Sequence, residues 1–323
     1  MTSADLKRSG ISTSSRVAEN LFWLGRYQER CDDEARLLRE ALDPTLREDH
    51  DEGKLSLPVL RLARAYSILE DDEGPRALFA AATLETQPFG LVGNLRTLER
   101  LAYTLRDRVS LDNMRTIVGL LQDPMVGQTD PALPDTLAWL NRTINSLTTL
   151  SGFTLDGMTR DDGWRFLSIG RRLERLCFYC LALRTALDGD LDSGLSWLLR
   201  LADSIMTYHS RYMARPEWLP VLDLVAMDTT NPRSILFQAQ GIVSYLDKSR
   251  EAFGDFSQCA AFRNATRALE QLEVADLRPE NLRLRHVVDQ LRGTAYALSD
   301  GLAQHFFNPV HSSVLPAWRR EIG

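Results

Sequence analysis

A short charged motif occurs twice in this sequence, each time within a segment of helical apolar periodicity. The copies are Gly25-Arg26-Tyr27-Gln28-Glu29-Arg30 and Gly170-Arg171-Arg172-Leu173-Glu174-Arg175. The residues that follow the second copy, 176–183, are almost wholly apolar, which is typical of a helix buried on most sides. A buried guanidinium or carboxylate is costly unless it is paired and hydrogen-bonded. The motif therefore predicts either an internal ion-pair network or a site for a polar ligand.

The spacing inside each copy suggests how these charges pair. Glu29 follows Arg26 by three residues, so the two side chains can pair within one helix, and Glu174 has the same relation to Arg171. The last arginine of each copy is then free to meet another group. One interpretation is a salt-bridge lattice that fixes a helix crossing. The other is a pocket in which paired arginines hold a carboxylate or phosphate, while the glutamates orient an amine or act as acid or base.

The glycine that opens each copy carries a second signal. Gly25 and Gly170 each cost about 1 kcal/mol in a helix interior. The same cost at the same place in both copies predicts close approach of another helix or of a ligand. On the first helix, Trp23 shares a stripe with the motif arginines, which adds an aromatic ring to the candidate site.

A third segment, 228–234, combines polar residues with a helix start. Asn231 is predicted to cap a helix whose first residue is Pro232. Arg233 and Ser234 are then available at the helix N-terminus, where backbone N–H groups favour anions. The candidate residues are catalytic Glu29 and Glu174, and substrate-binding Trp23, Arg26, Arg30, Arg171, Arg175, Arg233 and Ser234.

Composition and other motifs exclude several classes of site. A net charge of −6 argues against a nucleic-acid binder. There is no Gly-Lys-Ser/Thr phosphate loop and no zinc-like His or Cys spacing, so we expect no directly bound cofactor and no metal. Cys177 and Cys180 have redox-motif spacing but lie inside a helix, which favours packing. With no signal peptide and no membrane span, the expectation is a cytoplasmic protein with reduced thiols that does not bind a membrane.

Helical periodicity dominates the chain, and no convincing strand pattern occurs. The fold class is therefore predicted as all-α, a single bundle of about ten helices spanning 1–323, with a weak internal repeat whose halves are 14–120 and 134–307. Loops are predicted at 46–53 and 121–134. The predicted helices lie near 16–43, 57–71, 75–86, 91–109, 134–151, 162–187, 193–213, 232–252, 257–272 and 281–306.

The segment Ser15–Arg30 resembles the opening of the alpha-E family, bacterial helical proteins named for a Glu-Arg motif. The likeness continues through Gly157-Met158-Thr159-Arg160, Trp164, the second charged motif, the segment 208–212 and Asn231–Ser234, and it covers nearly the whole chain. The chain departs from the family pattern between Asn94 and Met114. If that stretch lines a family site, the site is altered here.

The resemblance implies an all-α fold and a role beside a circularly permuted ATP-grasp protein, often together with a transglutaminase-like protein. ATP-grasp enzymes activate a carboxylate and join it to an amine, so ATP and Mg would be bound by the partner. The expected function is a helical partner subunit that holds an amino acid or peptide substrate through the Arg/Glu network. The alternatives are an enzyme that transfers or cleaves an acyl group with Glu29 or Glu174 as general base, and a purely structural scaffold.

Overall fold

The computed structural model describes residues 14–43, 57–70, 75–86, 89–189, 195–212 and 215–307. Within these residues the chain forms α-helices and no strand, which confirms the all-α prediction. The first group of helices is α1 (Ser15–Leu42), α2 (Leu57–Ala65), α3 (Pro75–Thr83), α4 (Leu91–Thr104), α5 (Leu111–Leu121) and α6 (Leu133–Gly157). The second is α7 (Asp162–Asp188), α8 (Ser196–Leu201), α9 (Ile205–Tyr212), α10 (Trp218–Leu222), α11 (Ile235–Phe253), α12 (Ser257–Glu270) and α13 (Leu282–Leu302). Two short π-helical turns, η3 (Asp223–Met227) and η4 (Ala303–Phe307), follow α10 and α13.

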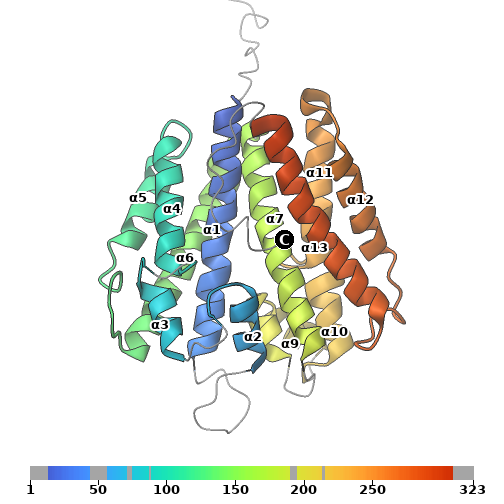
Figure 1. Ribbon diagram of the computed structural model, residues 1–323, viewed down its shortest axis with the longest axis horizontal. Coiled ribbons are helices and arrows are strands. Elements are labelled where there is room, and N and C mark those ends of the chain that lie inside the picture. Colours follow the sequence, from blue (N-terminus) through green and yellow to red (C-terminus); the bar gives the residue numbers. More distant parts are fainter. Residues whose placement is uncertain are drawn as a thin grey trace, which may run out of the picture.

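Helices α1 and α7 form the centre of the bundle and run side by side in the same direction (Figure 1). Helices α3 to α6 lie on the α1 side of this pair, and α10 to α13 lie on the α7 side. Because the central helices are covered on both flanks, residues around most of the α1 circumference are buried. Helix α6 packs on α1 and α5, although a division at residue 134 would assign it to the second half.

The close approach of α1 and α7 depends on the two motif glycines. A Cβ atom on Gly25 would lie less than 3.0 Å from the carbonyl oxygen of Leu167, and one on Gly170 would lie equally close to the carbonyl oxygen of Phe22. Each glycine thus faces the residue three positions before the other glycine. The two helices meet through equivalent turns, and the partner that the glycines approach is a helix.

Several helix boundaries differ from those predicted. The predicted helix at 91–109 ends at Thr104, and α5 was not predicted, although Ser110 caps it by accepting a hydrogen bond from the Asn113 N–H at 3.2 Å. The predicted helix at 193–213 is two helices, because the chain turns at Asp203 with a φ of 50°. The loop predicted at 46–53, together with His50 and His311, lies outside the described residues.

The N-terminus of α11 also differs from the prediction. The N-cap is Ser234, whose hydroxyl accepts a hydrogen bond from the Phe237 N–H at 3.0 Å. Asn231 instead accepts from the Arg233 N–H and donates to the carbonyl oxygen of Leu224, at 3.0 and 2.9 Å. Its side chain therefore fixes the loop before the helix, and Pro232 precedes the helix rather than opening it.

Candidate functional site

The charges of the two motifs pair across the α1–α7 contact in a reciprocal pattern. Glu174 of α7 accepts hydrogen bonds from Arg26 and from Arg30, the latter at 2.7 Å. Glu29 of α1 accepts from Arg171 at 2.6 Å and from Arg175 at 2.8 Å. Each glutamate is thus held by the first and last arginine of the other copy.

This pattern corrects the expected pairing within each helix. In each copy the glutamate and the first arginine, Arg26 or Arg171, lie on the helix face that meets the other helix. Because the glycines have no side chain, the two helices can approach closely at this face. A carboxylate on one helix can then receive two guanidinium groups from the other. Arg30 and Arg175, expected to be free of their motif glutamates, take part in the same network.

Two cavities flank the central helices, and the two motifs supply one carboxylate to each. The first has a volume of about 280 Å³ and its charged lining is Arg26, Arg30, Glu174 and Arg292. The second has a volume of about 240 Å³ and its charged lining is Glu29, Arg171, Arg172 and Arg175. The motifs therefore do not share one cavity, and each cavity holds three guanidinium groups against one carboxylate.

The third arginine of each cavity has no carboxylate within ion-pairing distance among the described residues. Arg172 lies over the rings of Phe237 and Tyr245, at 5.0 and 5.3 Å, and donates to the side-chain oxygen of Gln238 at 2.9 Å. Arg292 comes from α13 and faces the first cavity beside Tyr296. Both cavities thus carry excess positive charge next to aromatic rings, an arrangement suited to a carboxylate or phosphate on an organic ligand.

The glutamates are ionised in this setting. Burial alone would raise the pKa of Glu29, but the charges of Arg175 and Arg171 outweigh it and hold the pKa below its ordinary value. Burial is opposed in the same way at Glu174, where Arg26 and Arg30 lower the pKa. Each carboxylate therefore stays charged at neutral pH and serves first as an anchor for two arginines.

Three of the predicted ligand-binding residues lie away from the cavity linings. Trp23 packs edge-on against Phe22, with ring centroids 5.5 Å apart, and the Arg26 guanidinium lies 5.7 Å from its ring. Arg233 donates to Asp32 at 3.0 Å and to the Tyr179 hydroxyl at 3.1 Å. The Ser234 hydroxyl donates to the carbonyl oxygen of Asp228 in addition to capping α11. These side chains hold the elements around the cavities in place.

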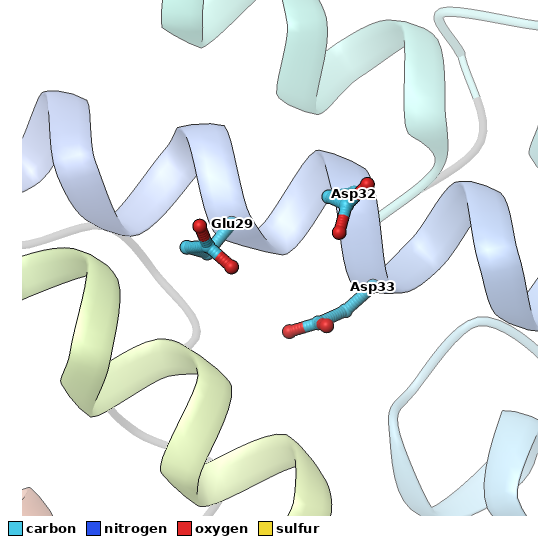
Figure 2. A group of neighbouring side chains, drawn as sticks. All are labelled: Glu29, Asp32 and Asp33. Atoms are coloured by element: carbon cyan, nitrogen blue, oxygen red, sulfur yellow. The ribbon is translucent and has the colours of Figure 1, made fainter. Parts of the chain in front are cut away.

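Sequence reasoning missed two carboxylates that follow the first motif, Asp32 and Asp33, which cluster with the predicted residue Glu29. Glu29, Asp32 and Asp33 are all buried, and one carboxylate oxygen from each lies within 4.8 Å of the others. Figure 2 shows the three side chains on neighbouring turns of α1, with that of Asp33 extending into the space between this helix and its neighbour. Their spacing of three and four residues was a readable signal, because it places all three on adjoining positions of one helix face. Arg292, by contrast, carries no local sequence signal.

The paired cysteines of α7 are packing groups. Cys177 and Cys180 are free thiols and are buried. Burial raises the pKa of Cys177 to about 12 and that of Cys180 well above its ordinary value. A redox-active thiol needs the opposite shift. Cys177 nevertheless lines the first cavity, together with Asn94.

A buried carboxyl beside the network gives a pH prediction. Glu34 is 0% exposed, and burial raises its pKa from 4.5 to about 8 although Asn94 donates to it at 2.8 Å. In this range the folded protein keeps a proton that the unfolded chain has lost, so stability falls as pH rises. We expect the free energy of unfolding to fall by up to about 1.4 kcal/mol per pH unit between about pH 5 and pH 8 because of this group.

Urea denaturation of wild type and Glu34→Gln across that range measures this effect. The variant lacks the titrating proton, so its stability should depend less steeply on pH, and the difference between the slopes isolates Glu34 from other groups. Parallel slopes for the two proteins would contradict the prediction.

The chain has relatives among known proteins. Residues 14–307 match a family described as a predicted alpha-helical domain with a conserved ER motif. The uncharacterized protein Rv2567 of Mycobacterium tuberculosis H37Rv is 26% identical over an alignment of 352 positions. The alignment covers 94% of this chain and 39% of the relative. The uncharacterized protein Mb2597 of Mycobacterium bovis matches to the same extent. The chain therefore spans about two fifths of the length of these relatives, and no solved structure matches it.

Among the described helices, none combines the length and the apolar character that a membrane crossing requires.

Proposed function

This chain belongs to the Alpha-E family, and we propose that it is a helical partner subunit of an ATP-grasp amide ligase that binds an acidic amino acid or peptide in its arginine-lined cavities. ATP and Mg are bound by the ATP-grasp partner, which activates the carboxylate. The chain described here contributes the substrate pockets, and a transglutaminase-like protein is a further candidate partner.

The observation that carries this proposal is the third arginine in each cavity. The reciprocal ion pairs alone explain two arginines and one glutamate per cavity, because they fix the helix crossing. They leave Arg172 and Arg292 without a carboxylate among the described residues. A guanidinium that lines a cavity of 240 to 280 Å³ gains a strong, directional hydrogen bond when a ligand carboxylate enters.

Two further facts support a partner role. The described residues offer arginines and aromatic rings at the cavities, which is a binding surface rather than a set of groups that activates ATP. The curated relatives are longer proteins in which the region similar to this chain makes up 39% of the length. A region that makes up only part of a longer polypeptide in its relatives is a reasonable subunit for a separate partner protein.

The alternative of an acyl-transfer or amide-hydrolysing enzyme is disfavoured by the glutamates themselves. A general base works best when its pKa lies near the operating pH. The arginines lower the pKa of Glu29 and Glu174 instead. A purely structural scaffold would need the reciprocal network and would use the contacts of Arg172 with α11, but it would not need Arg292.

The experiment measures ATP-dependent product formation by mass spectrometry with amino acids and short acidic peptides. Three samples are compared: this protein alone, the candidate ATP-grasp partner alone, and both together. Product from the pair only is the expected result. Equal product from the ATP-grasp protein alone would contradict the proposed subunit role.

Variants at the third arginines test the pockets. Arg172→Gln and Arg292→Gln should each lower kcat/KM of the pair about 10-fold to 100-fold, since a hydrogen bond to a charged group contributes about 1.5 to 3 kcal/mol. Arg115→Gln is the matched control, because that arginine is 69% exposed and pairs with Asp112 on its own helix. Thermal unfolding of Arg292→Gln and Arg115→Gln should match wild type, whereas Arg172→Gln also loses its contacts with α11 and should unfold at a slightly lower temperature. Unchanged kcat/KM in both cavity variants would support the scaffold instead.

A further inference from the structure

Helices α1 and α7 carry similar residues through the charged motif, but their residue types differ at the positions that follow it. Glu29 corresponds to Glu174, but the positions that follow, Asp32 and Asp33 on α1, correspond to Cys177 and Phe178 on α7. All four side chains are buried. Since α7 packs with a thiol and an aromatic ring at these positions, the helix crossing does not itself require carboxylates there.

Two of the three carboxylates in this cluster are already neutralised. Glu29 is held by Arg171 and Arg175. Asp32 accepts hydrogen bonds through its Oδ2 atom from Arg36 and from Arg233, both at 3.0 Å. These contacts leave no net negative charge on either group.

Asp33 is the exception. Its side chain is 0% exposed, and neither of its oxygens has a hydrogen-bond partner among the described residues. The Oδ1 atom of Asp32 is also without a partner. In Figure 2 the Asp33 side chain extends into the space between α1 and its neighbour. Burying an unpaired carboxylate costs several kcal/mol or more, so its charge must be neutralised by a bound cation or by a proton.

The donor set and the surrounding charge define that cation. Three unpaired oxygens, two from Asp33 and one from Asp32, are hard donors that suit alkali and alkaline-earth cations. One carboxylate oxygen from each of the three acidic residues lies within 4.8 Å of the others, so a single ion can reach all of them. Because four arginines already surround the other two carboxylates, a second positive charge would be repelled. Only the charge of Asp33 remains to be balanced.

We propose that Asp33, Asp32 and Glu29 form a binding site for one dehydrated monovalent metal cation, Na⁺ or K⁺, between α1 and α7. The site shares Glu29 with the second arginine-lined cavity, but Asp32 and Asp33 do not line that cavity, and the proposal does not depend on the proposed ligase role. Its guest balances the charge of Asp33 and fixes the carboxylates that hold Arg36, Arg175 and Arg233. The competing guest is a proton, because burial and the neighbouring charges of Glu29 and Asp32 raise the pKa of Asp33.

Thermal unfolding of the full chain in NaCl, KCl or choline chloride at equal ionic strength tests the proposal. Choline is too large for the site, so wild type should unfold several degrees higher in NaCl or KCl. Asp33→Asn, which mimics the protonated side chain, should lose this difference. Glu34→Gln should retain it, because it removes a neighbouring buried carboxyl that lies outside the cluster. Equal unfolding temperatures of wild type in all three salts would overturn the proposal. The same measurement in CaCl₂ and MnCl₂ tests for a divalent ion, and an unfolding temperature that rises only with these two salts would also overturn it.

A crystal grown with Tl⁺, which replaces K⁺ and scatters anomalously, locates the ion directly. The expected result is an anomalous peak in contact with the Asp33 carboxylate, absent from Asp33→Asn crystals. A wild-type crystal without this peak would show that a proton neutralises Asp33 and would overturn the cation site.

Discussion

Gly170→Ala is expected to separate the two central helices and to lower the free energy of unfolding by at least about 3 kcal/mol. The added Cβ would lie less than 3.0 Å from the carbonyl oxygen of Phe22, with the Phe22 carbonyl carbon and the Arg26 nitrogen close behind. All three are backbone atoms, which cannot rotate away as a side chain can. The helices must therefore move apart, and the four arginine–glutamate contacts that span them lengthen together. Urea denaturation followed by circular dichroism measures the loss.

A second helical glycine provides the control for this substitution. Gly293 lies in α13 with open space where a Cβ would project. Gly293→Ala should raise the free energy of unfolding by about 0.5 to 1 kcal/mol, because alanine is the better helix former. The two variants make the same chemical change with opposite expected signs. A Gly170→Ala protein as stable as wild type would show that α1 and α7 are less closely packed than described here.

The sequence was sufficient to identify the two central helices and to predict a close approach at their glycines, but it left open whether the approaching group is a helix or a ligand. Gly25 and Gly170 recur at one position of a repeated motif, and a recurring cost in helix propensity is a signal of close approach. Which arginines pair with which glutamate could not be predicted in the same way. Within one helix, Arg26 and Glu29 are neighbours by spacing alone, whereas their actual partners depend on the relative direction and register of two helices.

Other parts of the site could not be predicted from the sequence, because they depend on contacts between distant segments of the chain. Arg292 lies more than a hundred residues from the second motif, and only the path of α13 brings it to the first cavity. The N-cap of α11 was assigned to Asn231 because that residue type precedes a proline. Long-range hydrogen bonds to Leu224 and Ser204 instead hold Asn231 in the loop. Tertiary contacts of this kind override local capping preferences.

Glu174→Gln is expected to destabilise the fold by about 3 to 5 kcal/mol, the usual cost of removing one partner of a buried ion pair. Glutamine has nearly the same shape, so packing is preserved. The variant leaves Arg26 and Arg30 with positive charges and without a carboxylate between them. Arg26 is 2% exposed and has Ser299 as its other hydrogen-bond partner, at 3.1 Å. Its charge cannot be transferred to water without opening the bundle.

Glu29→Gln makes the equivalent change on the opposite helix and should cost less. Its arginines, Arg171 and Arg175, are 13% and 14% exposed, so both can turn partly toward solvent once the carboxylate is gone. Glu85→Gln is the surface control, because Glu85 is 59% exposed and should contribute less than about 1 kcal/mol through its pair with Arg96. Urea denaturation of the three variants gives the order directly. If Glu29→Gln and Glu174→Gln cost the same, the burial of Arg26 would not govern the stability of the network, and the two halves of the reciprocal pattern would be energetically equivalent despite their different exposure.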